Sequence, residues 1–371
     1  MPEIARVLQF PVRSRRIEEP LTPAEAFRAA EAYLALPSQD REQIDLTTKT
    51  DVLFAICRLL YERRDSKPSE VAAEAASLFS RIRDSASVGL FDEKDYLLGE
   101  LALISGNATR QLGRWADSDR WLNRAESCFR HVVNPGPKLA EVAYLRLALR
   151  FDQRQFADVL ELVPSLEMSF ERLEMSRERN KAAFLGAMCL KALSRDGEAR
   201  QRFDALSQRL DSDQESQLLG QTLIEMGAYE ASESRFESAL ETFGRALQLL
   251  KQGDRPILVA HLKATVAETL ARQGKLEASV QAYRESISDY ASIGVALQAA
   301  YLRVLLAEIL IQIERHREAE WELLAALPAI EEQKMVPEGF AAVALLKESV
   351  RRRKTDPNAL RELREHLQKQ N

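Results

Sequence analysis

Small, bulky and polar positions recur along this chain from near residue 91, with a period of roughly 40 residues, which is typical of repeat architectures. In every copy but the second, a small residue is followed, at steps of twelve, four and three, by a small residue, a bulky residue and a small residue or leucine; the second copy has the larger Leu147 and Val159 at its two small positions. The first column holds Gly106, Leu147, Ala187, Gly227, Ala267 and Ala307, and the steps between them are equal except for the first, which is longer by one position. The second column holds Ser118, Val159, Ala199, Ala239, Ser279 and Ala319, and the third holds Leu122, Val163, Phe203, Phe243, Tyr283 and Leu323. The fourth column holds Ala125, Leu166, Leu206, Ala246, Ser286 and Ala326. Six copies in near-constant register predict six tandem helix pairs over residues 91–333.

These spacings fit two antiparallel helices that pack closely against each other. Helices approach closely only where the contacting residues are small, and a bulky side chain then fills the space beside them. Gly113 and Gly274 fall between the helices of their copies, where a residue that accepts positive φ lets the chain reverse. Because one pair cannot bury its apolar face alone, the pairs must stack. We therefore expect an all-α fold, a right-handed α-α superhelical solenoid of helix hairpins.

The segments that flank the repeats are also predicted to be helical. Thr22, Pro23 and Glu25 predict a capped helix start, and that helix should end near Leu36. Further helices are expected near residues 39–46, 50–64 and 69–84, so residues 21–90 form an N-terminal helical segment, with room for a degenerate repeat. Residues 1–20 are expected to be a flexible basic tail, and residues 334–371 to form capping helices at about 338–353 and 358–369.

Composition and charge narrow the class of protein. Gly (14) and Pro (13) are scarce, and residues that favour helices dominate. A net charge of −5 gives no electrostatic push toward nucleic acid or an anionic membrane. The sequence predicts neither a transmembrane helix nor a secretion signal, so we expect a cytoplasmic protein. Its cysteines, Cys57, Cys128 and Cys189, are expected to be small buried hydrophobes without disulfides.

Motifs that carry chemistry are not found in the sequence. It contains no GxxxxGK[ST], GxGxxG, HExxH or GxSxG pattern, and Cys128 with His131 lacks a second ligand pair. We therefore expect no catalysis, no cofactor and no metal. The basic cluster from Arg351 to Lys354 fits the last turn of a helix, where cations are favoured, and an acidic partner or nucleic acid is the alternative. No aromatic residue is interleaved with the cluster, which disfavours nucleic acid.

Three stretches carry a resemblance to a known family. "SGNATRQLGRWADSDRWLNRAESCF" at 105–129, "EMGAYEASESRFESALETFGRALQLL" at 225–250 and "VAETLARQGKLEASVQAYRESI" at 266–287 resemble the tetratricopeptide repeat. The resemblance covers roughly residues 91–333 well and 50–90 weakly. Because the usual unit is shorter than the period found in this sequence, the chain resembles the long, degenerate members of that superfamily. The resemblance implies a concave groove, lined by the first helix of each pair, that binds a protein or peptide.

A second stripe on the first helices is expected to face this groove. It lies six and three positions before the first column and one and four positions after it, which keeps it on one helical face. The predicted ligand-binding residues on this stripe are Asn107, Arg110, Tyr144, Phe151, Lys181, Phe184, Met188, Gln221, Ile224, His261, Glu268 and Glu308. Aromatic residues would supply contact area, and polar residues would fix the register of an extended or helical peptide.

One known tetratricopeptide activity can be rejected on these residues. Some cochaperones of this type grip a C-terminal carboxylate with Lys, Asn, Asn, Lys and Arg at set positions. The corresponding positions here hold Leu103, Asn107, Leu145, Lys181 and Leu185, so only two of the five agree.

Two classes of function remain after these exclusions. The leading hypothesis is a non-catalytic scaffold or adaptor that binds a protein or peptide ligand. The alternative is a regulatory sensor, because the chain length and the long repeat unit are similar to those of Rap-type peptide-pheromone receptors and of sensor regions of bacterial transcription regulators. Residues 20–90 would then be an effector module. They show no helix-turn-helix with a basic recognition helix, so direct DNA binding is disfavoured. The sequence leaves the oligomeric state open.

Overall fold

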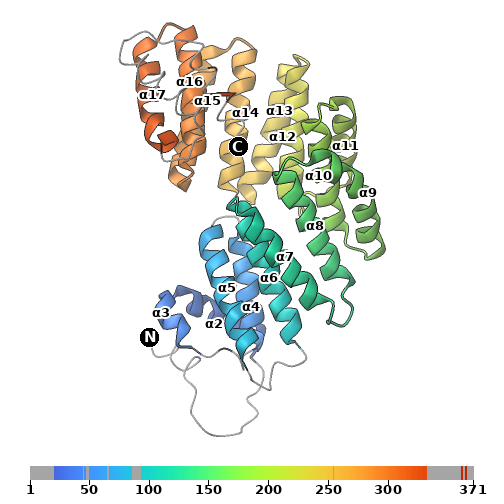
Figure 1. The fold of residues 1–371 in the computed structure, drawn as a ribbon. Helices are drawn as coiled ribbons and strands as arrows, with labels where there is room; N and C mark the ends of the chain where they lie inside the picture. The colour runs from blue at the N-terminus through green and yellow to red at the C-terminus, as the bar shows by residue number, and fades with distance from the viewer. Residues whose placement is uncertain are drawn as a thin grey trace. The chain divides into compact units, whose positions relative to one another are not determined.

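The computed structural model describes residues 21–44, 46, 50–64, 67–85, 93–253, 255–331, 361 and 364–365, and these form sixteen helices and no strand (Figure 1). By internal contacts the chain divides into two compact units, residues 1–195 and 196–371. Unit 1 contains α2 (Pro23–Ala35), α3 (Ser38–Glu42), α4 (Thr50–Arg63), α5 (Pro68–Asp84), α6 (Lys94–Gln111), α7 (Trp115–Phe129), α8 (Gly136–Asp152), α9 (Phe156–Arg172) and α10 (Ser176–Ala192). Unit 2 contains α11 (Asp196–Arg209), α12 (Ser216–Ser232), α13 (Phe236–Gln252), α14 (Pro256–Arg272), α15 (Leu276–Ile293), α16 (Ala296–Gln312) and α17 (His316–Glu331). The predicted fold class, an all-α solenoid of helix hairpins, is confirmed.

The start of α2 has the predicted capping box. The Glu25 backbone N–H donates to Thr22 Oγ1 at 3.4 Å, and the Thr22 N–H donates to the Glu25 carboxylate at 2.9 Å. The next helix was predicted over residues 39–46, but α3 is shorter and runs only from Ser38 to Glu42. Arg81 of α5 donates to the carbonyls of Arg41 and Ile44, so this side chain fixes the backbone where α3 ends. The predicted tail at 1–20, the Arg351–Lys354 cluster and almost all of the predicted C-terminal helices lie outside the described residues.

The repeat predicted from the sequence coincides with the helix hairpins. Unit 1 contains the pairs α6–α7 and α8–α9, and unit 2 contains α12–α13, α14–α15 and α16–α17, with neighbouring helices side by side (Figure 1). Every residue of the four columns is buried, in all six copies. The columns therefore form the core, as the pattern predicts.

The small columns mark the places where two helices come closest. Ser118 Oγ donates to the Gly106 carbonyl at 2.8 Å, and Ser279 Oγ makes the same bond to the Ala267 carbonyl at 2.8 Å. A hydroxyl can reach the facing backbone only when little else separates the helices, and the bond satisfies a group that is otherwise buried. A Cβ added at Gly227 would lie 2.5 Å from the Phe243 ring. The bulky third column thus occupies the volume that the small first column leaves.

A further pair of columns extends this contact but was not identified in the sequence. Seven residues before the first column lie Gly99, Ala140, Asn180, Gly220, Ala260 and Ala300, all buried. Seven residues after the third column lie Phe129, Phe170, Leu210, Leu250, Tyr290 and Ile330, also buried. A Cβ on Gly99 would meet the Phe129 ring at 2.4 Å, and one on Gly220 would meet Leu250 at 2.8 Å. The hairpins therefore interlock along two further helical turns.

The turn inside each hairpin repeats as strictly as the core does. Each of these turns has one residue with positive φ, between 58° and 82°, and these residues are Gly113, Arg154, Ser194, Ser234, Gly274 and Glu314. Only two of the six are glycine, the two that the sequence indicates. The other four hold a left-handed conformation that side chains disfavour.

Exchanging residues at two of these turns should move stability in opposite directions. Gly274→Ala, at φ +82°, should lower the free energy of unfolding by about 1 kcal/mol, and Ser234→Gly should raise it by several tenths of a kcal/mol. Urea unfolding of each variant measures both changes. Gly197→Ala is the control, because its φ is not positive and the added Cβ meets nothing within 4 Å. Equal effects of Ala at 197 and 274 would contradict this account of the turns.

Candidate functional site

The predicted ligand-binding stripe lies on the first helix of each hairpin, here called the first-helix face. In unit 1 it comprises Asn107 and Arg110 of α6, Tyr144 and Phe151 of α8, and Lys181, Phe184 and Met188 of α10. In unit 2 it comprises Gln221 and Ile224 of α12, His261 and Glu268 of α14, and Glu308 of α16.

Arg110 links two helices of this face in unit 1. Its Nη1 lies 2.6 Å from Asp152 Oδ2, which joins α6 to the end of α8. Its Nε and Nη2 donate to Asn107 Oδ1 at 3.2 and 3.1 Å. Asn107 is buried, so its amide positions the guanidinium and does not face solvent. Burial raises the pKa of Asp152, and Arg110 opposes that shift by stabilising the carboxylate.

Tyr144 lies among the same charged groups. Burial raises the pKa of its phenol, Arg110 and Arg64 act against that shift, and Tyr61 and Asp152 add to it. Tyr61 and Arg64 come from α4 and the residue that follows it, which the sequence prediction did not include. The Arg64 guanidinium lies 3.7 Å from the centre of the Tyr61 ring, and Tyr61 is 44% exposed. We call Tyr61, Arg64, Arg110, Tyr144 and Asp152 the Tyr144 cluster.

The remaining predicted residues of unit 1 are mostly apolar and half-buried. Phe151 packs edge-on against Phe156 of α9, with ring centres 5.1 Å apart. Phe184 and Met188 are half-buried on α10, and Lys181 lies 3.5 Å from Glu178. They contribute mainly apolar surface to the first-helix face of unit 1.

Two carboxylates on the same stripe were also missed. Six residues before the first column, Glu100 and Glu141 flank Lys138, at 2.7 and 3.1 Å. Burial alone would lower the pKa of Lys138, but the two carboxylates raise it above its ordinary value. Burial raises the pKa of Glu141, and Lys138 opposes that shift. This group adds partly buried charge to the first-helix face of unit 1.

The first-helix face of unit 2 is more acidic. Gln221 is half-buried and Ile224 buried, whereas His261 and Glu268 are exposed. Glu308 is half-buried, and its carboxylate lies 3.1 Å from Arg364.

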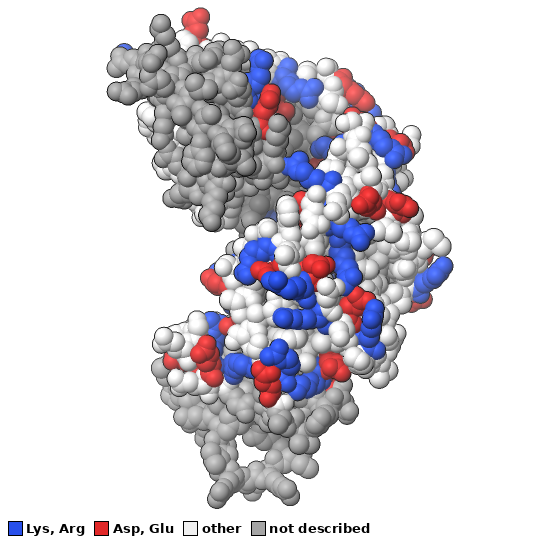
Figure 2. Space-filling view, viewed as in Figure 1, with Lys and Arg blue, Asp and Glu red and all other residues white. Residues whose placement is uncertain are grey.

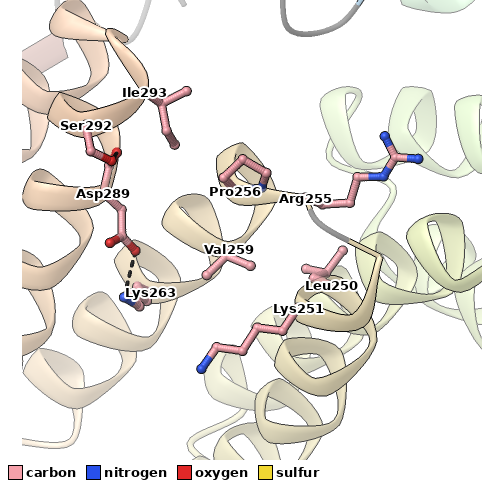
Figure 3. Close-up of a pocket in the computed structure, with 9 residues that line it drawn as sticks. All are labelled: Leu250, Lys251, Arg255, Pro256, Val259, Lys263, Asp289, Ser292 and Ile293. Atoms are coloured by element: carbon pink, nitrogen blue, oxygen red, sulfur yellow. Dashed lines mark hydrogen bonds and ion pairs between the residues drawn. The ribbon is translucent and has the colours of Figure 1, made fainter. Parts of the chain in front are cut away.

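A pocket of about 290 Å³ opens elsewhere in unit 2, between the ends of α13 and α15 and the start of α14 (Figure 3). Lys263 and Asp289 face each other across it at 2.6 Å. Lys251 and Arg255 also line it and form no ion pair within the described residues. Both side chains are exposed, and an ion pair between exposed charges contributes little free energy because water and salt screen it. The pocket offers positive charge but no enclosed site.

A larger cavity, of about 540 Å³, lies among the N-terminal helices of unit 1. Several of its polar groups contact one another. The Tyr33 hydroxyl donates to Glu74 at 3.0 Å and accepts from Arg81 at 3.1 Å, and Arg41 lies 3.0 Å from Glu74. Burial raises the pKa of Tyr33 to about 12. The network ties α2 and α3 to α5, which is a structural role.

The described part of the chain contains no group of three or more His, Cys, Asp or Glu residues that could hold a metal ion. Cys57 and Cys189 are buried, as predicted, and Cys128 is half-buried. None of the described helices is both long and apolar enough to span a bilayer. On the face drawn in Figure 2, described acidic and basic side chains are interspersed, without a large area of one sign.

Comparison with known proteins identifies the fold. No protein-family model matches the sequence, and no curated protein matches it either. The structure is similar to that of a Rap protein complexed with competence and sporulation factor, with 14% identity, a TM-score of 0.59, and 86% of this chain and 87% of that chain covered. It is also similar to aspartyl phosphate phosphatase F from Bacillus subtilis (10% identity, TM-score 0.55, 84% and 82% covered) and to the apo form of RapI (13%, 0.52, 74% and 97%). The chain therefore shares the tetratricopeptide-like helical-repeat fold of these proteins.

Proposed function

We propose that the protein is a non-catalytic scaffold or adaptor that binds a protein or peptide ligand on its first-helix face. The Tyr144 cluster is the observation that carries this proposal. It combines a partly exposed tyrosine, a half-buried tyrosine and an arginine already held by two hydrogen-bond partners. Aromatic and arginine residues dominate binding energy at protein interfaces, and preorganisation reduces the entropy lost on binding.

The arrangement of the cluster also suits a peptide better than a small molecule. Its residues come from α4, α6 and α8, so the contacts are spread over neighbouring helices. An extended or helical peptide can place successive side chains on such a surface, with aromatic rings as anchors. Among the similar structures, one Rap protein is complexed with competence and sporulation factor, which supports a ligand-binding role for this fold.

Removing the Tyr144 ring should weaken binding of any such peptide. Peptides selected from a displayed random library against the full-length chain would be measured by fluorescence anisotropy. Tyr144→Ala should raise their Kd by roughly 30-fold, the equivalent of about 2 kcal/mol for a central aromatic anchor.

The matched control is Trp115→Ala. Trp115 is 43% exposed and lies on α7, a second helix, so its removal should leave Kd within about twofold. If both variants bind the selected peptides as tightly as the unmodified chain, the first-helix face of unit 1 is not the ligand site. Circular dichroism would show that each variant is folded.

The alternative, a ligand-responsive sensor, has one observation in its favour. Tyr61 and Arg64 belong to the N-terminal helical segment, whereas Arg110 and Tyr144 belong to the repeats. A ligand on the Tyr144 cluster would contact both parts and stabilise one arrangement of them. Small-angle scattering with and without a selected peptide separates the two functions. A sensor should become more compact on binding, and a passive scaffold should not change.

A further inference from the structure

Two glutamates occupy equivalent positions on the first-helix face of unit 2. Glu268 of α14 and Glu308 of α16 each follow a residue of the first column and belong to consecutive copies of the repeat. Neighbouring copies therefore present carboxylates on the same side. Glu268 is exposed and Glu308 is half-buried, so both are within reach of a ligand.

A cation from a distant part of the chain already occupies this place. Arg364 Nη1 lies 3.1 Å from Glu308 Oε2, although the two residues are 56 positions apart in sequence. Its Nε is buried and has no hydrogen-bond partner among the described residues. A guanidinium has five donors, and Glu308 is the acceptor that the described residues supply to Arg364.

Tyr283 of α15 is buried near enough to these charged groups for them to act on its phenol. Its side chain is 3% exposed, and Glu268, Tyr301, Glu308 and Arg364 all act electrostatically on its phenol. Within the described residues the hydroxyl makes no hydrogen bond. Burial is the main cause that raises the pKa of this phenol, so it stays neutral and can accept a hydrogen bond from a cation.

We propose that Glu268, Glu308 and Tyr283 form a binding site for a basic side chain of a peptide ligand, and that Arg364 of the same chain fills it until the ligand displaces it. This inference rests on the proposed function and adds the charge of the ligand and a competing internal segment. The contact can be displaced because both partners are partly exposed, at 37% for Arg364 and 28% for Glu308. Tethering compensates for the weakness of the contact, because a tethered group acts at an effective concentration of the order of millimolar.

The test supplies the internal segment in trans. The probe is a fluorescein-labelled peptide with the sequence of residues 358–371, NALRELREHLQKQN. It is titrated with the full-length chain and with the variant Arg364→Glu, whose own segment no longer competes. We expect the variant to bind the probe about tenfold more tightly than the unmodified chain, because the site is then vacant.

Three controls define the site. Adding Glu308→Gln to Arg364→Glu should remove the gain, because the acceptor of the guanidinium is then uncharged. Adding Glu241→Gln instead should preserve it, because Glu241 is an exposed glutamate on α13, a second helix. A probe with glutamate at position 364 should bind none of the chains. Circular dichroism reports folding of each variant.

The outcomes separate this inference from the proposed function. Equal binding of the probe to all chains, or no saturable binding to Arg364→Glu, would overturn the site, whatever the library peptides do. Failure of the library peptides to depend on Tyr144 would instead reject the function proposed for unit 1 and leave this result standing.

Discussion

Replacing Gly227 with alanine should lower the free energy of unfolding by about 1–3 kcal/mol, although alanine is the better helix former by about 1 kcal/mol. The added methyl group would lie 2.5 Å from the Phe243 ring, and Phe243 is fully enclosed at 1% exposure. Because interiors are packed as densely as crystals, the ring cannot move away without disturbing its own neighbours. Chemical denaturation of both proteins gives the change.

The same substitution at Gly244 is the matched control. Gly244 lies on α13, a Cβ there would meet nothing within 4 Å, and alanine should therefore stabilise by up to about 1 kcal/mol. Combining Gly227→Ala with Phe243→Leu should recover part of the loss, since Leu122 and Leu323 hold the same column in other copies. A destabilisation that is the same at positions 227 and 244 would show that steric contact is not its cause.

The hairpins were predictable because their contacts repeat. The four columns identified in the sequence are buried in every copy, and Gly113 and Gly274 lie in turns as expected. The columns that begin at Gly99 and Phe129 were missed because a glycine or alanine within a helix is common and gives little contrast by itself. The left-handed turns at Arg154 and Glu314 carry no sequence signal, since neither arginine nor glutamate favours positive φ.

The division into two units also could not be predicted from the sequence. It lies between Arg195 and Asp196, next to the Ser194 turn of the third copy. The repeat continues in unchanged register through this point, so periodicity alone marks no boundary there.

The candidate site could be predicted only in part, for a related reason. Helical spacing placed Arg110 and Tyr144 on one face, but it could not show that Asp152 orients Arg110. Tyr61 was missed because its helix precedes the recognisable repeats. The contact of Arg364 with Glu308 spans 56 residues and follows no repeat, so only a three-dimensional structure reveals it.

The second large effect is expected at a buried ion pair in the last described hairpin. Glu322 of α17 is 3% exposed, and its carboxylate accepts a hydrogen bond from Arg303 of α16. Arg303→Met removes the positive charge but keeps most of the apolar side chain, which lies beside the Trp321 ring. The buried carboxylate is then uncompensated, which should lower the free energy of unfolding by about 3 kcal/mol, near the lower end for such pairs because Arg303 is 22% exposed.

The double variant distinguishes the loss of attraction from the cost of a buried charge. Arg303→Met with Glu322→Gln should regain much of the stability, because a neutral amide is far less costly to bury than a carboxylate. Arg200→Met breaks a comparable pair with Glu233 in which both side chains are more than a third exposed, and it should change stability by less than about 1 kcal/mol. If Arg303→Met lowers the free energy of unfolding as little as Arg200→Met does, then water reaches Glu322 and the ion pair contributes little to the stability of this hairpin. A large loss of stability that Glu322→Gln relieves would mean that the packing of α16 against α17 requires Arg303 to neutralise the buried carboxylate of Glu322.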